Sequence, residues 1–243
     1  MSNDRATGFC GTLRRTVPVV FLVLFLPAAA AGADPAKALA AAGWDESTPG
    51  RWNRLPERQA QVLDNGISGD FVLSPGTGAV WTKNGRWNPS EGTILSLEIT
   101  SDGTNPSSED YSEFDRHFPV SATVVFGRDS VKVPVRARLA RFFTRIWRGF
   151  QPGGIRLTYA FGNQVPVGSM YRPQDEEETV FILAGEDHAG KKIQAKRNLR
   201  NDFRAAYGRD PKGPVTRILV RTERPSDEKG TIRTHIRATF PAP

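Results

Sequence analysis

The feature that most constrains the fold is an alternation of apolar and polar residues in many short segments. In residues 93–100 every second side chain is apolar, and 119–127, 154–162 and 231–240 repeat the pattern. Successive side chains of a β-strand point to opposite faces, so each such segment has one buried and one solvated side. The segments 70–74, 78–83, 178–185, 191–196 and 214–223 also have strand character. Glycine, proline and short polar residues separate them, which predicts a mainly β protein whose antiparallel sheets pack face to face.

The beginning of the chain resembles a secretory signal peptide. Arg14 and Arg15 precede an apolar run at 17–31, and Ala31-Gly32-Ala33 is a small-x-small cleavage site. We therefore expect residues 1–33 to be removed and the mature protein to be periplasmic or secreted. The alternative is an uncleaved membrane anchor, but the run is shorter than the roughly 20 residues that span a bilayer.

The rest of the chain, 34–243, has a length that a single β-sandwich domain can accommodate. The only cysteine, Cys10, lies in the leader, so the mature chain has no disulfide, thiol nucleophile or thiolate metal site. The leader holds three of the 33 basic and one of the 26 acidic residues, so the mature chain keeps 30 and 25, a formal charge of +5. Acidic residues are interspersed throughout, which argues against a nucleic-acid partner.

Two segments depart from the β pattern and predict covering helices. In residues 197–208, Leu199, Phe203 and Tyr207 recur every four residues, Asn198 can cap the start and Gly208 ends the turn. This segment is interpreted as a lid with one apolar stripe.

The second helical segment, 136–150, has a broad apolar side and a basic side formed by Arg138, Arg141, Arg145 and Arg148. Such a helix suits an anionic membrane surface or a polyanionic glycan, with any membrane contact peripheral. The alternative, which we favour, is a crossover helix that covers one end of the sandwich, since most amphipathic helices bury their apolar stripe against the core.

No catalytic residue, cofactor or metal site can be assigned from the sequence. Glu186, Asp187 and His188 lie between two glycines and are interpreted as a structural hairpin turn. His117 and His235 have no partner at a metal-ligand spacing. The chain contains no nucleophile elbow, zinc-protease motif, P-loop or dinucleotide fingerprint.

A candidate glycan platform is "WTKNGRWN", where Trp81 and Trp87 lie among hydrogen-bonding side chains. An exposed indole ring packs well on the apolar face of a sugar while neighbouring polar groups bind its hydroxyls. The alternative is a hairpin with both tryptophans in the core, because large aromatic side chains are mostly buried.

Residues 93–240 resemble the bacterial domain-of-unknown-function family 3047, which comprises exported proteins. The resemblance is carried above all by "GNQVPVG", with Asn163, Pro166 and Gly168, and by "RNLRNDFRAAYG", with Arg197, Asn198, Asp202, Phe203, Tyr207 and Gly208. It implies an exported, jelly-roll-like β-sandwich of the galactose-binding-like kind and implies no reaction. The chain departs from the family in "ERPSDEKGT", where Glu223 and Asp227 lie in place of an Asp-rich turn that ends in Asn-Thr.

The resemblance nominates Asn163, Arg197, Asn198 and Asp202 as ligand-binding candidates whose polar groups could line one pocket. It also favours a pair between Asp202 and an arginine such as Arg197 that fixes the helix on the sheet. The function expected from the sequence is non-catalytic binding of a carbohydrate or another envelope component. The alternatives are a polysaccharide hydrolase with a carboxylate pair and attachment to an anionic surface through 136–150.

Overall fold

The computed structural model describes residues 34–50, 53–89, 93–107, 117–127, 154–162, 165–173 and 177–240. These belong to a single compact unit, Ala33–Pro243. The expected signal peptide, the arginine-rich segment 136–150 and Asn163 lie outside the described residues. Among the described residues, no helix is both long and apolar enough to span a bilayer.

Two β-sheets form the body of this unit, as the sequence predicts. The seven-stranded sheet has the order β1 (Trp44–Ser47), β4 (Thr77–Trp87), β11 (Val215–Arg224), β6 (Val120–Phe126), β7 (Ile155–Phe161), β9 (Glu178–Ala184) and β8 (Met170–Tyr171). The five-stranded sheet has the order β10 (Ile193–Asn198), β5 (Ile94–Ser101), β12 (Ile232–Thr239), β3 (Gly66–Leu73) and β2 (Glu57–Leu63). Neighbouring strands are antiparallel except β7 and β9, which are parallel.

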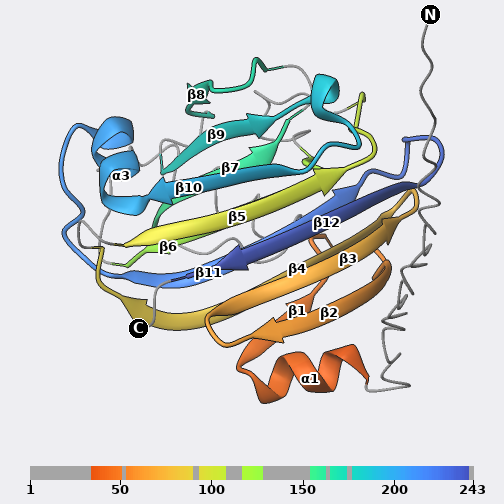
Figure 1. Cartoon of the computed structure of the whole chain (residues 1–243), viewed down its shortest axis with the longest axis horizontal. Coiled ribbons are helices and arrows are strands. Elements are labelled where there is room, and N and C mark those ends of the chain that lie inside the picture. Colours follow the sequence, from red (N-terminus) through yellow and green to blue (C-terminus); the bar gives the residue numbers. More distant parts are fainter. Residues whose placement is uncertain are drawn as a thin grey trace, which may run out of the picture. The chain divides into compact units, whose positions relative to one another are not determined.

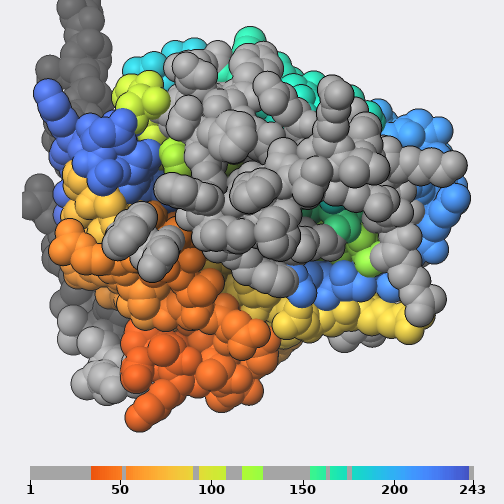
Figure 2. Space-filling model, turned by 180° about the vertical axis from the view of Figure 1, so that it is seen from behind, coloured from red at the N-terminus to blue at the C-terminus, as the bar shows by residue number. Residues whose placement is uncertain are grey.

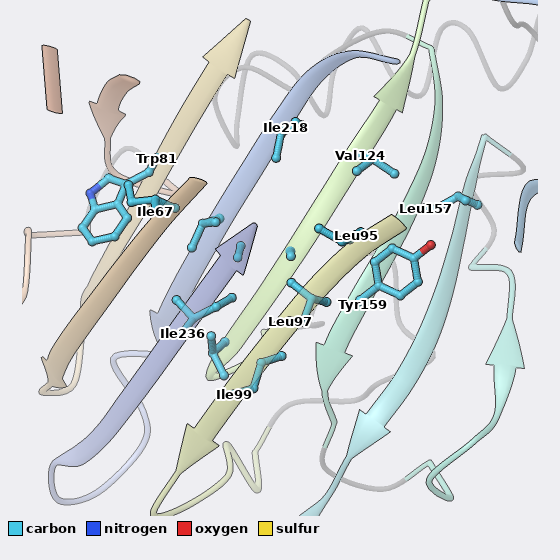
Figure 3. Close-up of a cluster of buried hydrophobic side chains, with 14 of the residues drawn as sticks. Ile67, Trp81, Leu95, Leu97, Ile99, Val124, Leu157, Tyr159, Ile218 and Ile236 are labelled. Carbon is cyan, nitrogen blue, oxygen red and sulfur yellow. The ribbon is translucent and has the colours of Figure 1, made fainter. Parts of the chain in front are cut away.

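The alternating apolar residues form the core between the two sheets. Leu95, Leu97 and Ile99 of β5 are buried, and they face Val124 and Leu157 of the seven-stranded sheet (Figure 3). The polar residues between them on β5 lie on the outer face of the five-stranded sheet. The mainly β, jelly-roll-like sandwich is therefore confirmed.

The described part of the chain contains two α-helices at the margins of the sheets. α1 (Pro35–Ala41) begins at Asp34, whose side chain accepts a hydrogen bond from the backbone N–H of Ala36, and it contacts β1 and β2. α3 (Leu199–Tyr207) follows β10 directly and lies at one end of that strand (Figure 1). Asn198 caps α3, and Gly208 ends it in the left-handed conformation, so the helix predicted at 197–208 is confirmed.

Each of the last two strands of the chain lies in the interior of one of the two sheets. β11 lies between β4 and β6, and β12 lies between β3 and β5. The turn between β11 and β12 meets the turn between β3 and β4, where the N–H of Gly76 donates to the carbonyl of Arg224 at 3.0 Å. Figure 2 shows this C-terminal turn, coloured blue, against the orange surface of the early strands.

Candidate functional site

A groove of about 550 Å³ crosses the outer face of the five-stranded sheet. Four neighbouring strands, β5, β12, β3 and β2, form its floor, and its margin includes Asp102 and Gly190. On these strands Phe71 and Thr234 are buried on the inner side of the sheet, so they contribute backbone to the groove. The side chains that face the groove come from Glu57, Gln59, Asp70, Val72, Thr100, Asp102, Arg233 and His235.

One row of polar side chains runs straight across the groove. The strand register pairs Thr100 with His235, His235 with Asp70, and Asp70 with Gln59. Register partners point to the same face of a sheet, so four strands each present one hydrogen-bonding side chain in a line.

His235 is held at the middle of this row by carboxylates on both sides. Its Nδ1 lies 2.9 Å from Oδ1 of Asp70, and its Nε2 lies 3.8 Å from Oε1 of Glu98. Glu98 in turn accepts hydrogen bonds from Lys192 at 2.7 Å and from Gln194 at 3.0 Å. The ammonium group of Lys192 and the amide of Gln194 lower the pKa of Glu98, which stabilises its negative charge.

A second row lies two residues further along the same strands. Val72 is the register partner of both Arg233 and Glu57. Asp102 extends this row, because its Oδ1 accepts a hydrogen bond of 2.7 Å from the backbone N–H of Arg233. The groove is therefore lined by two parallel rows that combine donors, acceptors and one apolar side chain.

An ion pair between the sheets anchors the β2 side of the groove from within. Arg58 donates from Nε and Nη2 to the two carboxylate oxygens of Glu46, both at 2.5 Å. Nε1 of Trp81 donates to Oε1 of Glu46 at 2.8 Å. Because Glu46 is on β1 and Arg58 is on β2, this network joins the edges of the two sheets and holds β2 in place.

The proposed tryptophan platform is not on the surface. Trp81 is 0% exposed and packs against Phe71, with ring centroids 4.7 Å apart and ring planes tilted by 42°, and Trp87 is 6% exposed. Both indoles project from β4 into the core, so the interpretation of Trp81 and Trp87 as an exposed sugar platform is wrong. The alternative, a hairpin with both tryptophans in the core, is right about their burial, but both lie on the single strand β4.

The signature residues Arg197, Asn198 and Asp202 lie together at the junction of β10 and α3, away from the groove. Arg197 forms a two-pronged ion pair with Asp202, with donor–acceptor distances of 2.9 and 2.7 Å. The hydroxyl of Tyr159 donates to Oδ2 of Asp202 at 2.8 Å. Oδ1 of Asn198 accepts from the N–H of Asn201 at 3.0 Å. The polar groups of these candidates thus bind the protein itself.

This cluster fixes α3 on the seven-stranded sheet. Asp202 is 9% exposed, and the guanidinium carbon of Arg197 lies 5.0 Å from the ring centre of Phe181. Burial, together with the negative charge of Asp202, raises the pKa of Tyr159 well above its ordinary value, so its hydroxyl remains a donor. The pair predicted between Arg197 and Asp202 is confirmed, and its position supports the lid interpretation.

The other signature stretch forms part of the connection between the parallel strands β7 and β9. Val165 is buried against Phe118 and Val180 on the outer side of the seven-stranded sheet. Gly168 has a φ of 86°, a left-handed conformation that favours glycine, and its N–H donates to the carbonyl of Ile182 at 2.9 Å. The glycine of this motif thus has a structural reason, while the role predicted for Asn163 remains a prediction.

Glu223, in the stretch that departs from the family pattern, is the centre of a second polar cluster. Its carboxylate binds the side chains of Asn53 at 3.1 Å, His117 at 3.0 Å and Arg221. Burial alone raises the pKa of Glu223, but the charge of Arg221 and the hydrogen bond from His117 outweigh it and lower the pKa to about 2. The carboxylate is therefore ionised and held by its own neighbours.

Among the residues that the structure describes, the two buried carboxylates on the outer face of the seven-stranded sheet, Glu178 and Glu223, are too far apart for glycoside hydrolysis. The register places Glu178 level with Arg217, three strands away, and Glu223 lies six residues further along β11. Strand spacing and rise then separate Glu178 from Glu223 by about 24 Å. The carboxylates of a glycosidase pair lie roughly 5 to 9.5 Å apart.

The residues between Gly185 and Gly190 connect the two sheets. Glu186–His188 form a 3₁₀ turn between β9 and β10, and these strands belong to different sheets. The expected hairpin is therefore wrong, because a hairpin joins paired strands. Within the described ranges, no group of three histidine, cysteine or acidic residues could hold a metal ion.

The sequence did not identify most of the groove. It assigned His235 no partner, and it did not nominate Gln59, Asp70 or Arg233. The polar positions that alternate with the core residues are the only signal for this face. Because Asp70 and His235 are 165 residues apart, their pairing requires knowledge of the strand order.

Among the solved structures that resemble this fold are the three that follow. The chain is 10% identical to the catalytic domain of Humicola grisea Cel12A in complex with thio cellotetraose (TM-score 0.46, covering 82% of this chain and 93% of that one). It is 10% identical to Trichoderma harzianum endoglucanase 3 from family GH12 (TM-score 0.36, 82% and 98%). It is 11% identical to the enzymatically active domain of bacteriophage CBA120 tailspike protein 4 (TM-score 0.31, 82% and 19%). These likenesses concern the fold alone.

Comparison with curated protein sequences found no significant match. A family profile, in contrast, matches residues 79–235, which extend from β4 into β12 and include both signature stretches. The chain therefore belongs to the family described as protein of unknown function (DUF3047).

Proposed function

We propose that this protein is an exported, non-catalytic binding protein that holds a glycan chain in the groove on the five-stranded sheet. The observation that carries the proposal is the line of polar side chains that four adjacent strands direct into one groove. The leader-like sequence at residues 1–33 is the reason to place the protein in the periplasm or outside the cell.

The hydrogen-bonding groups of the groove match a ligand that is rich in hydroxyls. A hydroxyl both donates and accepts, so it binds best where donors and acceptors alternate. The carboxylates of Glu57 and Asp70 accept, the guanidinium group of Arg233 donates, and the amide of Gln59 does both. In the described part of the chain the side chains of Glu57 and Gln59 make no hydrogen bond, so they are available to a ligand.

The groove is also prepared for binding before a ligand arrives. Its residues lie on strands of a sheet, and Asp70 and His235 hold each other at 2.9 Å. Side chains that are already ordered lose less conformational entropy when they bind, which favours affinity. The second row also contains Val72, on which the apolar side of a sugar ring can rest.

Isothermal titration calorimetry on residues 34–243 tests the proposal. The probes are oligosaccharides of six sugar units: neutral β-1,4-glucan, chitosan and oligogalacturonate. We expect saturable binding of at least one of them, and weaker binding after Asp70→Asn. The control is Asp210→Asn, since Asp210 is an exposed carboxylate that pairs with Arg200 and Arg204 outside the groove.

Two outcomes contradict the proposal. One is the absence of heat with every probe, or equal affinity of the Asp70→Asn variant. The other is the release of new reducing ends during a long incubation, which would show catalysis in place of simple binding.

A further inference from the structure

The shape of the groove specifies how a chain lies in it. Along each strand the groove extends over only two outward positions, such as Asp70 and Val72 on β3 or Arg233 and His235 on β12. Across the strands it extends over four, from β5 to β2. The next outward residues along the strands, among them Gln61 and Arg237, are not part of the lining. The long axis of the groove is therefore perpendicular to the strands.

Resting on the proposed function, we propose that the ligand is a linear, extended glycan of at least four units that runs across the strands, with one sugar on each strand. Neighbouring strands in a sheet are about 4.8 Å apart, so the row from Thr100 to Gln59 spans about 14 Å. The distance between neighbouring strands is close to the length of one sugar ring in an extended chain. The hydrogen-bonding side chains thus recur with the period of the ligand.

The two rows of side chains form the two long sides of the groove. Residues two positions apart on a strand are about 6.7 Å apart, which leaves the width of a single chain between the rows. The row of Thr100, His235, Asp70 and Gln59 lies along one side, and Arg233 and Glu57 lie along the other. A branched or tightly coiled glycan does not fit two straight rows, whereas a flat, ribbon-like chain contacts both.

Contacts at the two middle strands of the groove depend on ligand length differently from contacts at its two end strands. Asp70 and His235 lie at the two middle strands, so any bound fragment, however short, can contact them. Thr100 and Gln59 lie at the two ends, so only a chain that covers all four strands contacts both. Affinity should therefore increase with chain length up to four units and then level off.

A length series measured by calorimetry tests this inference, with β-1,4-glucan and chitosan oligomers of two, three, four and six units as probes. We expect affinity to rise about tenfold or more from two to four units, which corresponds to one or two added hydrogen bonds. From four to six units it should change by less than about twofold, since the added units extend beyond the groove.

Variants at the end of the row provide the second readout. Gln59→Ala should lower the affinity for the four-unit oligomer several-fold and leave that for the two-unit oligomer unchanged. Gln61→Ala is the matched control, because Gln61 is an exposed glutamine on the same face of β2, opposite Ser68, outside the groove lining. Asp70→Asn should weaken binding of both lengths.

The possible failures are distinguishable. If no oligomer binds, the proposed function is refuted, and this inference with it. If oligomers bind with an affinity that does not depend on length, or if Gln59→Ala and Gln61→Ala have equal effects, the chain does not run across the strands. In that case the binding function stands and the orientation is wrong.

Discussion

Replacing Asp202 by alanine is expected to destabilise the protein by about 3 kcal/mol. Asp202 accepts two hydrogen bonds from Arg197 and one from Tyr159, at 2.9, 2.7 and 2.8 Å. Removing one partner of a buried ion pair costs about 3 to 5 kcal/mol because the other charge stays buried without compensation. The Arg197 side chain is 29% exposed, so water recovers part of this loss and places the expected value at the lower end. The hydroxyl of Tyr159 loses its acceptor in a fully buried position.

Urea denaturation of residues 34–243, followed by circular dichroism, measures this change in the free energy of unfolding. The control is Asp210→Ala, which removes an exposed carboxylate near the same helix and should leave the denaturation midpoint close to that of the wild type. The double variant Arg197→Met with Asp202→Leu should recover at least half of the loss, because it removes both charges together. A loss below about 1 kcal/mol in Asp202→Ala would refute the argument that this pair fixes α3 on the sheet.

Three further predictions concern other parts of the sandwich. The pKa of Glu223 is lowered from 4.5 to about 2. Its ionised form therefore contributes stability that is complete above pH 4.5 and is lost as the pH falls towards 2. The difference in unfolding free energy between wild type and Glu223→Gln should be roughly 3 kcal/mol at pH 7 and should decrease as the pH falls from 4.5 to 2. Glu46→Gln should lower the unfolding free energy by about 3 kcal/mol, since Arg58 loses its buried partner, and should alter the fluorescence of Trp81; an unchanged midpoint in urea contradicts the proposed link between the sheets. Gly168→Ala should cost about 1 kcal/mol in thermal unfolding because of its left-handed backbone, whereas Gly185→Ala, at an extended φ of −149°, should cost less.

The elements that could be predicted are those whose residue pattern lies within one short segment of the sequence. The alternation in 93–100 predicted β5, and the cap at Asn198 with the glycine at Gly208 predicted both ends of α3. β2 was not predicted, because Glu57–Leu63 consists mostly of polar residues and is an edge strand with little buried surface. The parallel pairing of β7 and β9 was also not predicted, since parallel pairing depends on a crossover that no short motif encodes.

The candidate site could not be predicted because it depends on strand order. The sequence leaves both an exposed and a buried Trp81 open. Its polar neighbours Thr82 and Asn84 point to the opposite face of the strand, so they say little about the burial of Trp81. Asp70 becomes the neighbour of His235 only when β12 inserts between β3 and β5, and Gln59 joins the row through its pairing with Asp70. In contrast, Arg197 and Asp202 are only five residues apart, and the pair could be predicted from the family resemblance of that one segment.

The central positions of β11 and β12 make completion of the fold depend on the last strands to be synthesised. Until β12 is present, β3 and β5 have no common neighbour, and until β11 is present, β4 and β6 have none. Without β11 and β12 each sheet is divided into two parts, so the nascent chain has four sheet fragments with unpaired edges until almost its entire length is available. Such non-local pairing slows folding. The sandwich can therefore close only after nearly the whole chain has been synthesised.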